Sequence, residues 1–472
     1  MTFVTPPTLS TERAAITVAL TGASGGFGRT FLAQLRQLPT VRPSVLVDLN
    51  LAALVEMLDA IGFDRAEWTE CTDAAEVAAT VAAGRFALVT DIELCGPESY
   101  EVLVEATGST RAGFRFAQRA IDQQRHVIMV SKEVESLSGV YLADRAATAG
   151  VAYFPGMGDQ PANLLALLSW IQAVGLEVVA VGKSSEYDLN FDPATSIVRQ
   201  LTQEVAAPAL ADLLELGDDV AATLAEREFA TRAFKRAAAA DYCEMAVVSQ
   251  YSGFSPDVES MHYPVARPNE LADIYALREH GGILAREGVT DVFSMLRLPN
   301  EASFAGGEFV IVKTHDAETW SILREKGHVV SRDGHYACIF SPFHFMGVET
   351  PLSVLAAVAP NRVAETPRQY STLVGRVEAG LPAGTVLRVA GHHHEIAGVA
   401  PVLRETSTVE ADVAPFYLLD GATLVRSVAS GDLITIDDVE GYDPVLWDAF
   451  QAGRVLPAID GMPVVTSAGG AA

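Results

Sequence analysis

The sequence is poor in cysteine and in basic residues, and it has no long apolar run. Its 472 residues include four cysteines and no Cys-x-x-Cys pair, which disfavours a disulfide framework or a cysteine zinc site and is typical of reduced cytosolic thiols. Lysine and arginine number 33 against 60 aspartates and glutamates, a formal charge of -27, so nucleic acid and anionic membrane surfaces are poor partners. No apolar run reaches the roughly 18 residues of a membrane span, and residues 1–13 lack the pattern of a leader. We therefore expect a cytoplasmic protein that binds neither nucleic acid nor membrane.

A glycine-rich turn follows the first apolar stretch. Residues 16–21 are typical of a buried strand, and a helical pattern follows the turn. In such a turn Gly22 allows a sharp bend, Gly25 lets the backbone approach a pyrophosphate, and Gly28 permits close helix packing. The N–H groups at the start of the helix then face the anion. The residues expected to bind a dinucleotide here are Gly22, Ser24, Gly25, Gly26, Phe27 and Gly28.

An acidic residue ends the second apolar run. Asp48 follows residues 43–47 at about the spacing from Gly22 at which a carboxylate binds the ribose hydroxyls of a dinucleotide. The other interpretation is a glycine-rich turn in an α/β domain without a cofactor. Because strand, turn, helix and acid agree, we predict that a nicotinamide dinucleotide binds here.

Strand and helix patterns alternate through the first third of the chain. The apolar runs typical of strands are 45–48, 86–91, 101–105, 126–131 and 151–154, and the helical patterns are 30–38, 51–61 and 113–123. Near-continuous apolar strands separated by helices indicate an α/β, doubly wound parallel sheet. We predict a Rossmann domain over residues 14–155. Thr107, Gly108 and Ser131 follow two of these strands and should border the nicotinamide or the pyrophosphate.

The pattern changes after residue 155. Helices are expected at 164–174, 208–215 and 220–240, the last with a break between 226 and 231, and strands at 177–182, 309–314 and 336–340. We predict an inserted α+β substrate domain over 156–344, followed by a helix within 345–360 that returns to the first domain. Such an insertion would form a cleft over the nicotinamide. Short strands and glycine turns then indicate a small β-rich module over 370–440, and we expect a C-terminal tail over 441–472 with a frayed end.

Two lysines are placed for hydride-transfer chemistry. A lysine in a dry pocket can exchange a proton with the substrate oxygen once desolvation lowers its pKa. Lys132 lies just beyond a parallel strand, and Lys183 follows the strand expected at 177–182; either is otherwise a solvated surface lysine. Asp159, in a turn before a helix, either binds a substrate hydroxyl, a metal ion or a lysine, or only caps the helix.

Other polar residues have an open assignment. His262, Arg267, Lys313 and His344 fall in loops or at strand ends, where each can receive a carboxylate or phosphate or can serve the structure alone. The run of histidines at 392–394 is a poor metal site, because adjacent histidines do not converge on one ion. Carboxylates at 186, 188 and 192 can supply oxygen ligands to magnesium but are also typical of solvated loops. The metal site is therefore left unassigned.

Motifs that carry a family resemblance lie in order along the chain. They are Glu105–Gly108, His126–Glu133, Gly156–Pro161, Gly182-Lys183, Leu189–Asp192, Met261-His262, Ser341–His344, Glu349–Pro351, Gly421–Arg426 and Gly431–Thr435. In this order they resemble the homoserine-dehydrogenase-like oxidoreductases that carry a C-terminal SAF domain, especially the 1-deoxy-D-xylulose 5-phosphate reductoisomerase-like (DRL) proteins. The resemblance implies a homodimer and the reduction of a small phosphorylated or polyhydroxylated carbonyl compound, in one branch coupled to isomerisation of its carbon skeleton. Such an isomerisation needs a divalent ion or a cationic group to polarise adjacent oxygens.

The chain departs from this family at three points. Its glycine turn is one residue longer than the usual Gly-x-Gly-x-x-Gly. Asp48 stands where these proteins tend to carry basic residues for NADPH, and because a carboxylate repels a 2′-phosphate, NAD is favoured over NADP. Gln160 stands where an acid is common, which counts against a metal-assisted rearrangement.

The sequence thus predicts an NAD(P)-dependent oxidoreductase. Lys183 is the main candidate for proton transfer or carbonyl polarisation, with Lys132 as a second, and Asp159, His262 and His344 are expected to position the substrate. Two other functions stay open. One is a simple alcohol or semialdehyde dehydrogenase like the homoserine dehydrogenases, and the other is a non-catalytic protein that binds a dinucleotide or a sugar through the SAF-like module.

Overall fold

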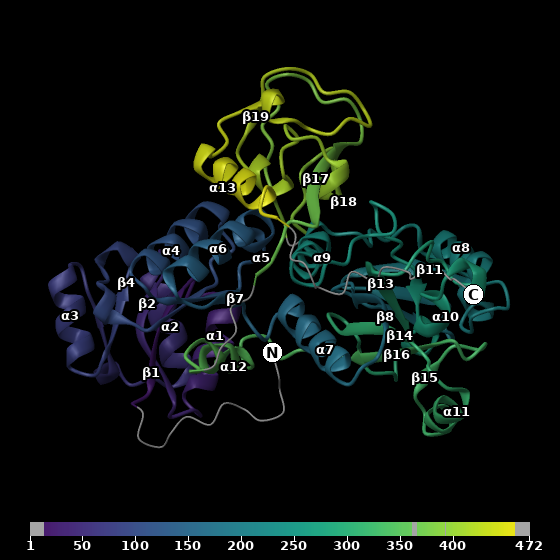
Figure 1. Cartoon of the computed structure of the whole chain (residues 1–472), viewed down its shortest axis with the longest axis horizontal. Helices are drawn as coiled ribbons and strands as arrows, with labels where there is room; N and C mark the ends of the chain where they lie inside the picture. The colour runs from purple at the N-terminus through teal and green to yellow at the C-terminus, as the bar shows by residue number, and fades with distance from the viewer. Residues whose placement is uncertain (1–13, 361–365, 392, 458–472) are drawn as a thin grey trace.

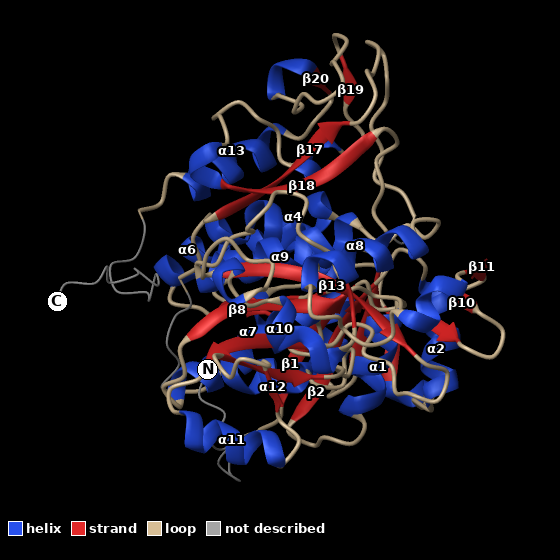
Figure 2. Cartoon of the chain, turned by 90° about the vertical axis from the view of Figure 1, so that its right-hand side faces the viewer, coloured by secondary structure: helices blue, strands red, loops and turns tan. Residues whose placement is uncertain are grey.

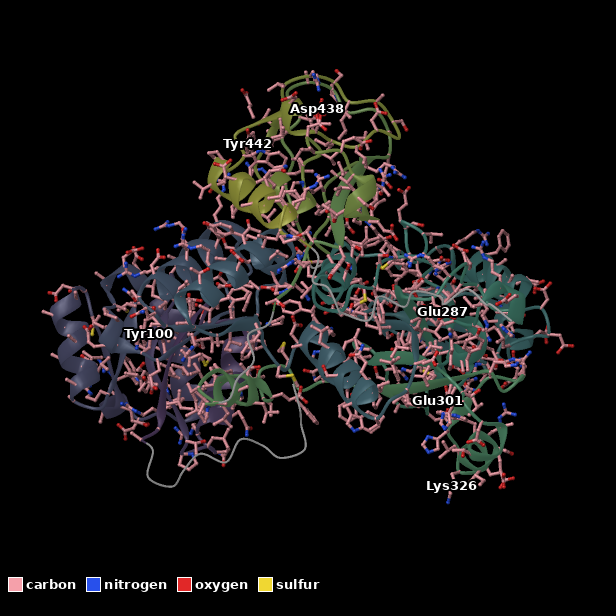
Figure 3. All side chains as sticks on the ribbon, in the orientation of Figure 1. Tyr100, Glu287, Glu301, Lys326, Asp438 and Tyr442 are labelled. Atoms are coloured by element: carbon pink, nitrogen blue, oxygen red, sulfur yellow. The ribbon has the colours of Figure 1, made fainter. Side chains whose placement is uncertain are left out.

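The chain folds into three lobes in the computed structural model (Figure 1), which describes residues 14–360, 366–391 and 393–457. The expectations for residues 1–13, for His392 and for the chain beyond residue 457 concern residues outside this description. Within the described ranges no helix is long and apolar enough to cross a membrane. Tyr100 lies in the first lobe, Glu287 in the second and Tyr442 in the third (Figure 3).

The first lobe is a seven-stranded sheet in the order β3-β4-β2-β1-β5-β6-β7, and all its pairings are parallel. Its strands are β1 (Ile16–Thr21), β2 (Val41–Val47), β3 (Trp68–Glu70), β4 (Phe86–Val89), β5 (Val102–Glu105), β6 (His126–Met129) and β7 (Tyr153–Pro155). Its helices are α1 (Gly26–Leu35), α2 (Leu51–Ile61), α3 (Ala74–Ala82), α4 (Thr110–Asp122), α5 (Lys132–Val134) and α6 (Val140–Ala149). The predicted α/β fold with a doubly wound parallel sheet is confirmed.

Helix α1 begins earlier than its sequence suggests. It starts at Gly26, whereas the helical pattern begins at residue 30. Glycine is a poor helix former, so two glycines in the first turn hide the start of this helix. Gly28 is nevertheless required there, because a Cβ at this position would lie 2.3 Å from the carbonyl oxygen of Ala23.

The chain returns to the first lobe after leaving it. Helix α12 (Thr350–Ala357) packs against α1 and β6, and its Val354 and Ala357 are buried in the core formed by residues of β1, β2 and β5. The second lobe is therefore inserted between two segments of the first lobe. Residues that precede the insertion and residues that follow it can both line a cavity between the two lobes.

The second lobe is built on a nine-stranded mixed sheet. Its strands are β8 (Val178–Ser184), β9 (Leu189–Asp192), β10 (Ile197–Gln200), β11 (Gln203–Ala206), β12 (Val265–Ala266), β13 (Val289–Arg297), β14 (Glu308–Lys313), β15 (Val329–Val330) and β16 (Tyr336–Ser341). Its helices are α7 (Gln160–Ala173), α8 (Val220–Thr231), α9 (Ala239–Ser252), α10 (Leu271–Ile274) and α11 (Ala317–Glu325). Strand β8 pairs in parallel with β13 and antiparallel with β14.

Two expectations for this lobe are wrong. The break expected between 226 and 231 in the helical stretch 220–240 lies later, because α8 ends at Thr231 and α9 begins at Ala239. The last turn of α8 is fixed by the buried Arg227, which pairs with Glu270 on the neighbouring turn and donates to backbone carbonyls. The helix expected over 208–215 is a short 3-10 turn, Pro208–Asp212.

The third lobe contains two small antiparallel sheets. Strand β17 (Ser371–Val377) pairs with β18 (Val399–Glu405), and β19 (Thr423–Leu424) pairs with β20 (Val439–Glu440). The long pair packs on α9 of the second lobe (Figure 2), and α13 (Pro444–Arg454) packs on α6 of the first. The expectation of a tail from residue 441 is therefore wrong for the α13 segment, whose apolar residues dock on another lobe.

The close approach at Gly28 gives a prediction for stability. In Gly28→Ala the new methyl group would meet backbone atoms of Ala23, which cannot rotate away, so we expect the melting temperature to fall by about 2 to 10 °C. Gly380→Ala is the control, because its methyl group would meet nothing closer than 3.7 Å. Equal melting temperatures of the two variants in a thermal scan would contradict the packing role.

Candidate active site

The glycine turn lies at the point where the order of the parallel strands reverses. β1 lies between β2 and β5 in the sheet, and Gly22 follows β1 with φ +68°, a conformation that favours glycine. A Cβ on Gly22 would lie 2.4 Å from the carbonyl oxygen of Ala106, which follows β5. The reversal point between two such strands is where open α/β sheets bind their ligands.

The start of α1 suits an anion. Gly25 occupies the N-cap, so no side chain caps the helix, and no acidic residue lies in the first turn. The N–H groups at this helix end are left for an external acceptor such as a diphosphate. Asp48 lies beside the turn, where one carboxylate oxygen accepts from the Ser24 amide at 2.8 Å and the other from the Asn50 amide at 2.9 Å.

The ends of β5 and β6 are joined by hydrogen bonds. The Gly108 amide donates to Ser131 Oγ at 2.8 Å. Glu105 is fully buried and accepts from the Thr107 amide at 3.0 Å; burial raises the pKa of its carboxyl group. These bonds fix the two loops at the edge where the nicotinamide is expected.

A cavity of about 460 Å3 opens at this edge. It is lined by residues of all three lobes: Phe27, Ala106, Gly108, Val130, Ser131, Lys132, Glu133, Asp159, Gln160, Lys183, Glu186, Ala240, Asp241, Glu244, Ala305, Gly306, His344, Met346 and His394. Of the predicted residues, the structure brings together Phe27, Gly108, Ser131 and the catalytic candidates at 132, 159, 183 and 344.

Two lysines share one carboxylate in this cavity. Lys132 pairs with one oxygen of Glu244 and Lys183 with the other, and Lys183 also donates to Asp241 at 2.8 Å. Lys183 lies within β8, not after it as the sequence suggested, and its side chain is 1% exposed, whereas that of Lys132 is 21% exposed. One anion therefore joins α5, β8 and α9.

This pairing corrects the expectation of a lysine with a lowered pKa. Burial alone would lower the pKa of both lysines, but nearby carboxylates outweigh it and raise both pKa values above their usual range. These are Glu244, Asp159 and Glu133 for Lys132, and Asp241 and Glu244 for Lys183. The pKa of Glu244 is lowered to about 2, because the two ammonium groups overcome the effect of its burial. Both lysines are thus charged hydrogen-bond donors at neutral pH and do not act as neutral bases.

Asp159 occupies the N-cap of α7, but its side chain does not cap the helix. When the side-chain amide of Gln160 is oriented with its nitrogen toward the neighbouring carboxylates, it donates to Asp159 at 2.7 Å and to Glu244 at 3.2 Å. Burial raises the pKa of Asp159 against the opposing effect of Lys132. The carboxyl group therefore belongs to the cavity cluster, as one of the two interpretations predicted.

A second buried acid lies behind the cavity. Glu308 pairs with Lys183 in the register of β14 and β8, and its carboxylate is 3.9 Å from His344 Nδ1. That nitrogen lies 3.1 Å from the Gly306 carbonyl oxygen. Burial, with the nearby Glu349, raises the pKa of Glu308 to about 8.

The third lobe contributes His394 to the cavity. Its Nδ1 lies 2.7 Å from the Tyr417 hydroxyl and 3.6 Å from a Glu133 oxygen. Burial raises the pKa of Glu133 to about 7. Gly108, Glu133 and His394 also line a second cavity, of about 600 Å3, between the first and third lobes.

Three predicted residues lie elsewhere. His262 pairs with Asp291 and lies 3.4 Å from Asp257, and the structure does not bring it to the cavity. Arg267 pairs with Glu301, and Lys313 lies 2.9 Å from Glu287. These pairings account for the positions of all three side chains.

The sequence analysis missed Asp241 and Glu244. They stand three residues apart on α9, whose residues from Ala239 to Gln250 are all buried. A helix that is buried all round has no polar face to indicate its orientation. The available signal was this pair of acids within an apolar helical stretch, since buried charges need partners.

The cavity does not contain a ligand set for a divalent ion. Among the residues that the structure describes, one group of three His, Cys, Asp or Glu has ligand atoms within 4.8 Å of one another, and none of its members lines the cavity. Glu244 is already paired with two ammonium groups, and Asp188, one of the predicted oxygen ligands, accepts from Arg297 at 2.6 Å. The residues present therefore do not fit a magnesium ion here.

One segment of the chain matches a known family of catalytic domains. Residues 158–350, which include Asp159, Lys183 and Glu244, match the family model described as oxidoreductase DRL, catalytic domain. No curated protein matches the chain.

Solved structures give only distant similarities. A 1-deoxy-D-xylulose 5-phosphate reductoisomerase from Zymomonas mobilis in complex with NADPH is 14% identical over 75% of this chain and 73% of its own, with a TM-score of 0.33. An oxidoreductase from Agrobacterium radiobacter in complex with NAD+, L-tartaric acid and magnesium is 13% identical over 37% of this chain, with a TM-score of 0.27. The present chain spans 45% of that protein. Scores this low carry no inference about substrate or reaction.

The raised pKa of Glu308 predicts how stability depends on pH. The folded protein binds a proton at Glu308 up to about pH 8, whereas the ordinary pKa of glutamate is 4.5. Folding therefore becomes less favourable as pH rises through this window. Between pH 5 and 8 the unfolding free energy of the native chain should fall by up to about 4 kcal/mol relative to Glu308→Gln.

Denaturant titrations at several pH values measure this difference. Glu325→Gln, at an exposed position on α11, is the control for the substitution itself. A difference between the native chain and Glu308→Gln that does not change with pH would refute the assignment of the proton to Glu308.

Proposed function

We propose that the protein reduces, or oxidises in reverse, a small polyhydroxylated or phosphorylated carbonyl compound with a nicotinamide dinucleotide. The observation that supports this most directly is the pair of lysines around Glu244 in a cavity that adjoins the glycine turn. The dinucleotide, when bound, supplies or accepts the hydride. The protein supplies the groups that bind and polarise the substrate oxygen.

The lysines have donors to spare. An ammonium group carries three N–H donors; Lys183 uses two of them on Asp241 and Glu244, and Lys132 uses one on Glu244. The remaining donors can hold a carbonyl oxygen as negative charge develops on it, which lowers the barrier for hydride addition. Because burial raises the pKa of Asp159, its carboxyl group is suited to hold the proton that the oxygen finally takes or gives.

The two ammonium groups also bear on whether the reaction is a simple dehydrogenation or includes an isomerisation. Isomerisation of a carbon skeleton requires that two adjacent oxygens be polarised, and two ammonium groups on one carboxylate can do this without a metal ion. We therefore keep the reductoisomerase reaction within the proposal. The lack of a metal-ligand set among the cavity residues favours the simpler alternative, an alcohol or semialdehyde dehydrogenase of the homoserine dehydrogenase kind.

A binding assay followed by a substrate screen tests the proposal. NADH and NADPH are titrated by fluorescence, and carbonyl compounds and sugar phosphates are then screened with the preferred dinucleotide. Analysis of the product separates the branches, because only the reductoisomerase changes the carbon skeleton. Dinucleotide binding without turnover across the panel would favour a non-catalytic binding protein. A SAF-like role for the third lobe, a homodimer and a cytoplasmic location stay predictions.

Lys183→Met tests the role of the lysine pair. We expect turnover to fall at least about 100-fold, because one of the two cations is lost, while the dissociation constant for the dinucleotide changes less than about twofold. The substitution leaves buried acids without a partner, a destabilising change, so folding is checked by circular dichroism and Lys183→Arg should recover part of the activity. Lys313→Met, at the last residue of β14 and outside the cavity lining, is the control. Near-normal turnover of Lys183→Met would remove this residue from the proposal.

Asp48→Ser tests the choice of dinucleotide. We propose NAD as the preferred cofactor, since the Asp48 carboxylate beside the turn repels a 2′-phosphate. The variant should bind NADH about tenfold more weakly, or roughly 1.4 kcal/mol, and should gain affinity for NADPH relative to NADH. Asp64→Ser, at the exposed cap of another turn of the same lobe, is the control. An unchanged ratio of the two affinities would contradict the preference.

A further inference from the structure

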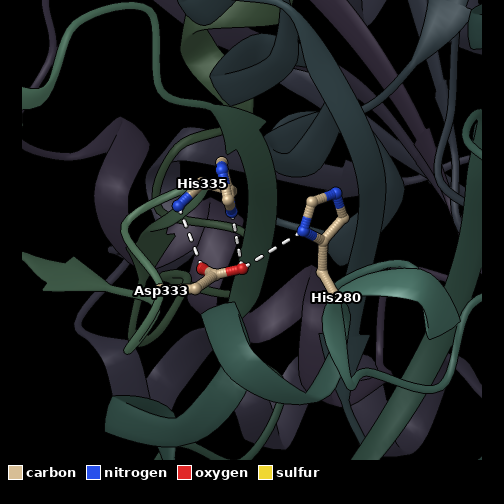
Figure 4. A group of neighbouring side chains, drawn as sticks. All are labelled: His280, Asp333 and His335. Carbon is tan, nitrogen blue, oxygen red and sulfur yellow. Dashed lines mark hydrogen bonds and ion pairs between the residues drawn. The ribbon is translucent and has the colours of Figure 1, made fainter.

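Two loops of the second lobe bring two histidines onto one carboxylate. His280 ends the 3-10 turn Arg278–His280, and Asp333 and His335 lie in the turn between β15 and β16. Figure 4 shows Asp333 between the two imidazole rings. Its Oδ2 atom lies 3.3 Å from His280 Nδ1 and 2.7 Å from His335 Nδ1.

The other oxygen of Asp333 is held by its own turn. Oδ1 accepts from Ser331 Oγ at 2.6 Å and from the His335 amide at 3.0 Å. The His280 ring is held against the His335 ring at 4.5 Å and the edge of Tyr336 at 5.5 Å between centroids. The carboxylate and both rings are thus oriented before any ligand binds, as the outer contacts of a metal site orient its ligands.

No cation of the surrounding chain competes for Asp333. The nearby Arg332 donates to the carbonyls of Leu216 and Gly217 and lies 3.8 Å from Asp273. In the described chain the ion pairs of Asp333 are those with His280 and His335. This distinguishes the group from the carboxylates of the active-site cavity, which lysines already neutralise.

We propose that His280, Asp333 and His335 form a binding site for a zinc-class divalent ion. Two imidazole nitrogens and one carboxylate oxygen are a ligand set that zinc accepts. Their ligand atoms lie within 4.8 Å of one another. A tetrahedral zinc ion with bonds of about 2.0 to 2.1 Å places its ligands about 3.3 Å apart. The separation from His280 matches this value, and that from His335 has to lengthen by about 0.6 Å.

The site has room for a further ligand. Asp333 and His335 also line a cavity of about 380 Å3, together with residues of α11 and the loop before it. Three protein ligands leave at least one coordination position for water or a small anion. The ion would join the loop at His280 to the β15–β16 turn, and none of its ligands lines the dinucleotide cavity, so this proposal is independent of the proposed function.

A cobalt titration tests the site, because Co2+ reports its coordination in visible absorption. The intact, untagged protein is treated with a chelator and titrated with CoCl2, then with ZnCl2 in competition. We expect one equivalent with the absorption of four- or five-coordinate cobalt, displaced by zinc. Zinc should also raise the melting temperature. His280→Ala and His335→Ala should each weaken binding at least tenfold, and Asp333→Asn should weaken it as well.

His328→Ala is the matched control, since its side chain is exposed in the same lobe and lies outside both the group and the cavity beside it. Circular dichroism shows whether each variant folds. An absorption typical of six-coordinate aqueous cobalt, or a stoichiometry and affinity unchanged in folded His280→Ala and His335→Ala, would overturn the proposal. An equal loss in the control variant would indicate unspecific surface binding and would overturn it too.

Discussion

The structure depends on one carboxylate held between two ammonium groups. Glu244 pairs with Lys132 through one oxygen and with Lys183 through the other, so helix α5 of the first lobe, strand β8 of the second sheet and helix α9 meet at one point. Removing one partner from a buried ion pair typically costs about 3 to 5 kcal/mol. The same ion pairs therefore fix both the shape of the cavity at this point and the positions of its two ammonium groups. A cluster that orients two cations without a metal ion can polarise an oxygen wherever a nicotinamide ring can reach it.

The lobes contribute different things to this cavity. The first provides a glycine turn and helix end suited to a diphosphate, the second provides the charged cluster, and the third places His394 beside Glu133. Because α9 packs both on the strands of the second lobe and on β17 and β18 of the third, its position is fixed from two sides. A movement of the third lobe would thus shift the charged cluster around Glu244, through α9 and through His394.

The parts of the fold that local sequence defines were predictable. Helix α2 runs from Leu51 to Ile61 as expected, and the turn after β1 was found from its glycines, because both patterns lie within a few residues. Strand β13 was missed, since Thr290, Asp291 and Ser294 are buried in it and break the apolar run that marks a central strand.

The site was predictable only in part, for a related reason. Lys132, Asp159 and Lys183 stand at strand and helix ends, where local patterns place them, but Asp241 and Glu244 come from a helix buried on every side. These two acids determine the charge of the lysines, so the protonation state of the lysines could not be inferred from the lysines alone. His394 reaches the cavity from a distant part of the chain, a contact that no local pattern indicates.

The return of α12 to the first lobe has a consequence for synthesis on the ribosome. Val354 and Ala357 complete a core whose other members come from early in the chain, so this core stays open until most of the polypeptide has left the exit tunnel. Domains generally fold as they emerge, and open cores are prone to aggregate. A nascent chain of this protein would accordingly expose an apolar face for many seconds, a natural target for chaperones that act during translation.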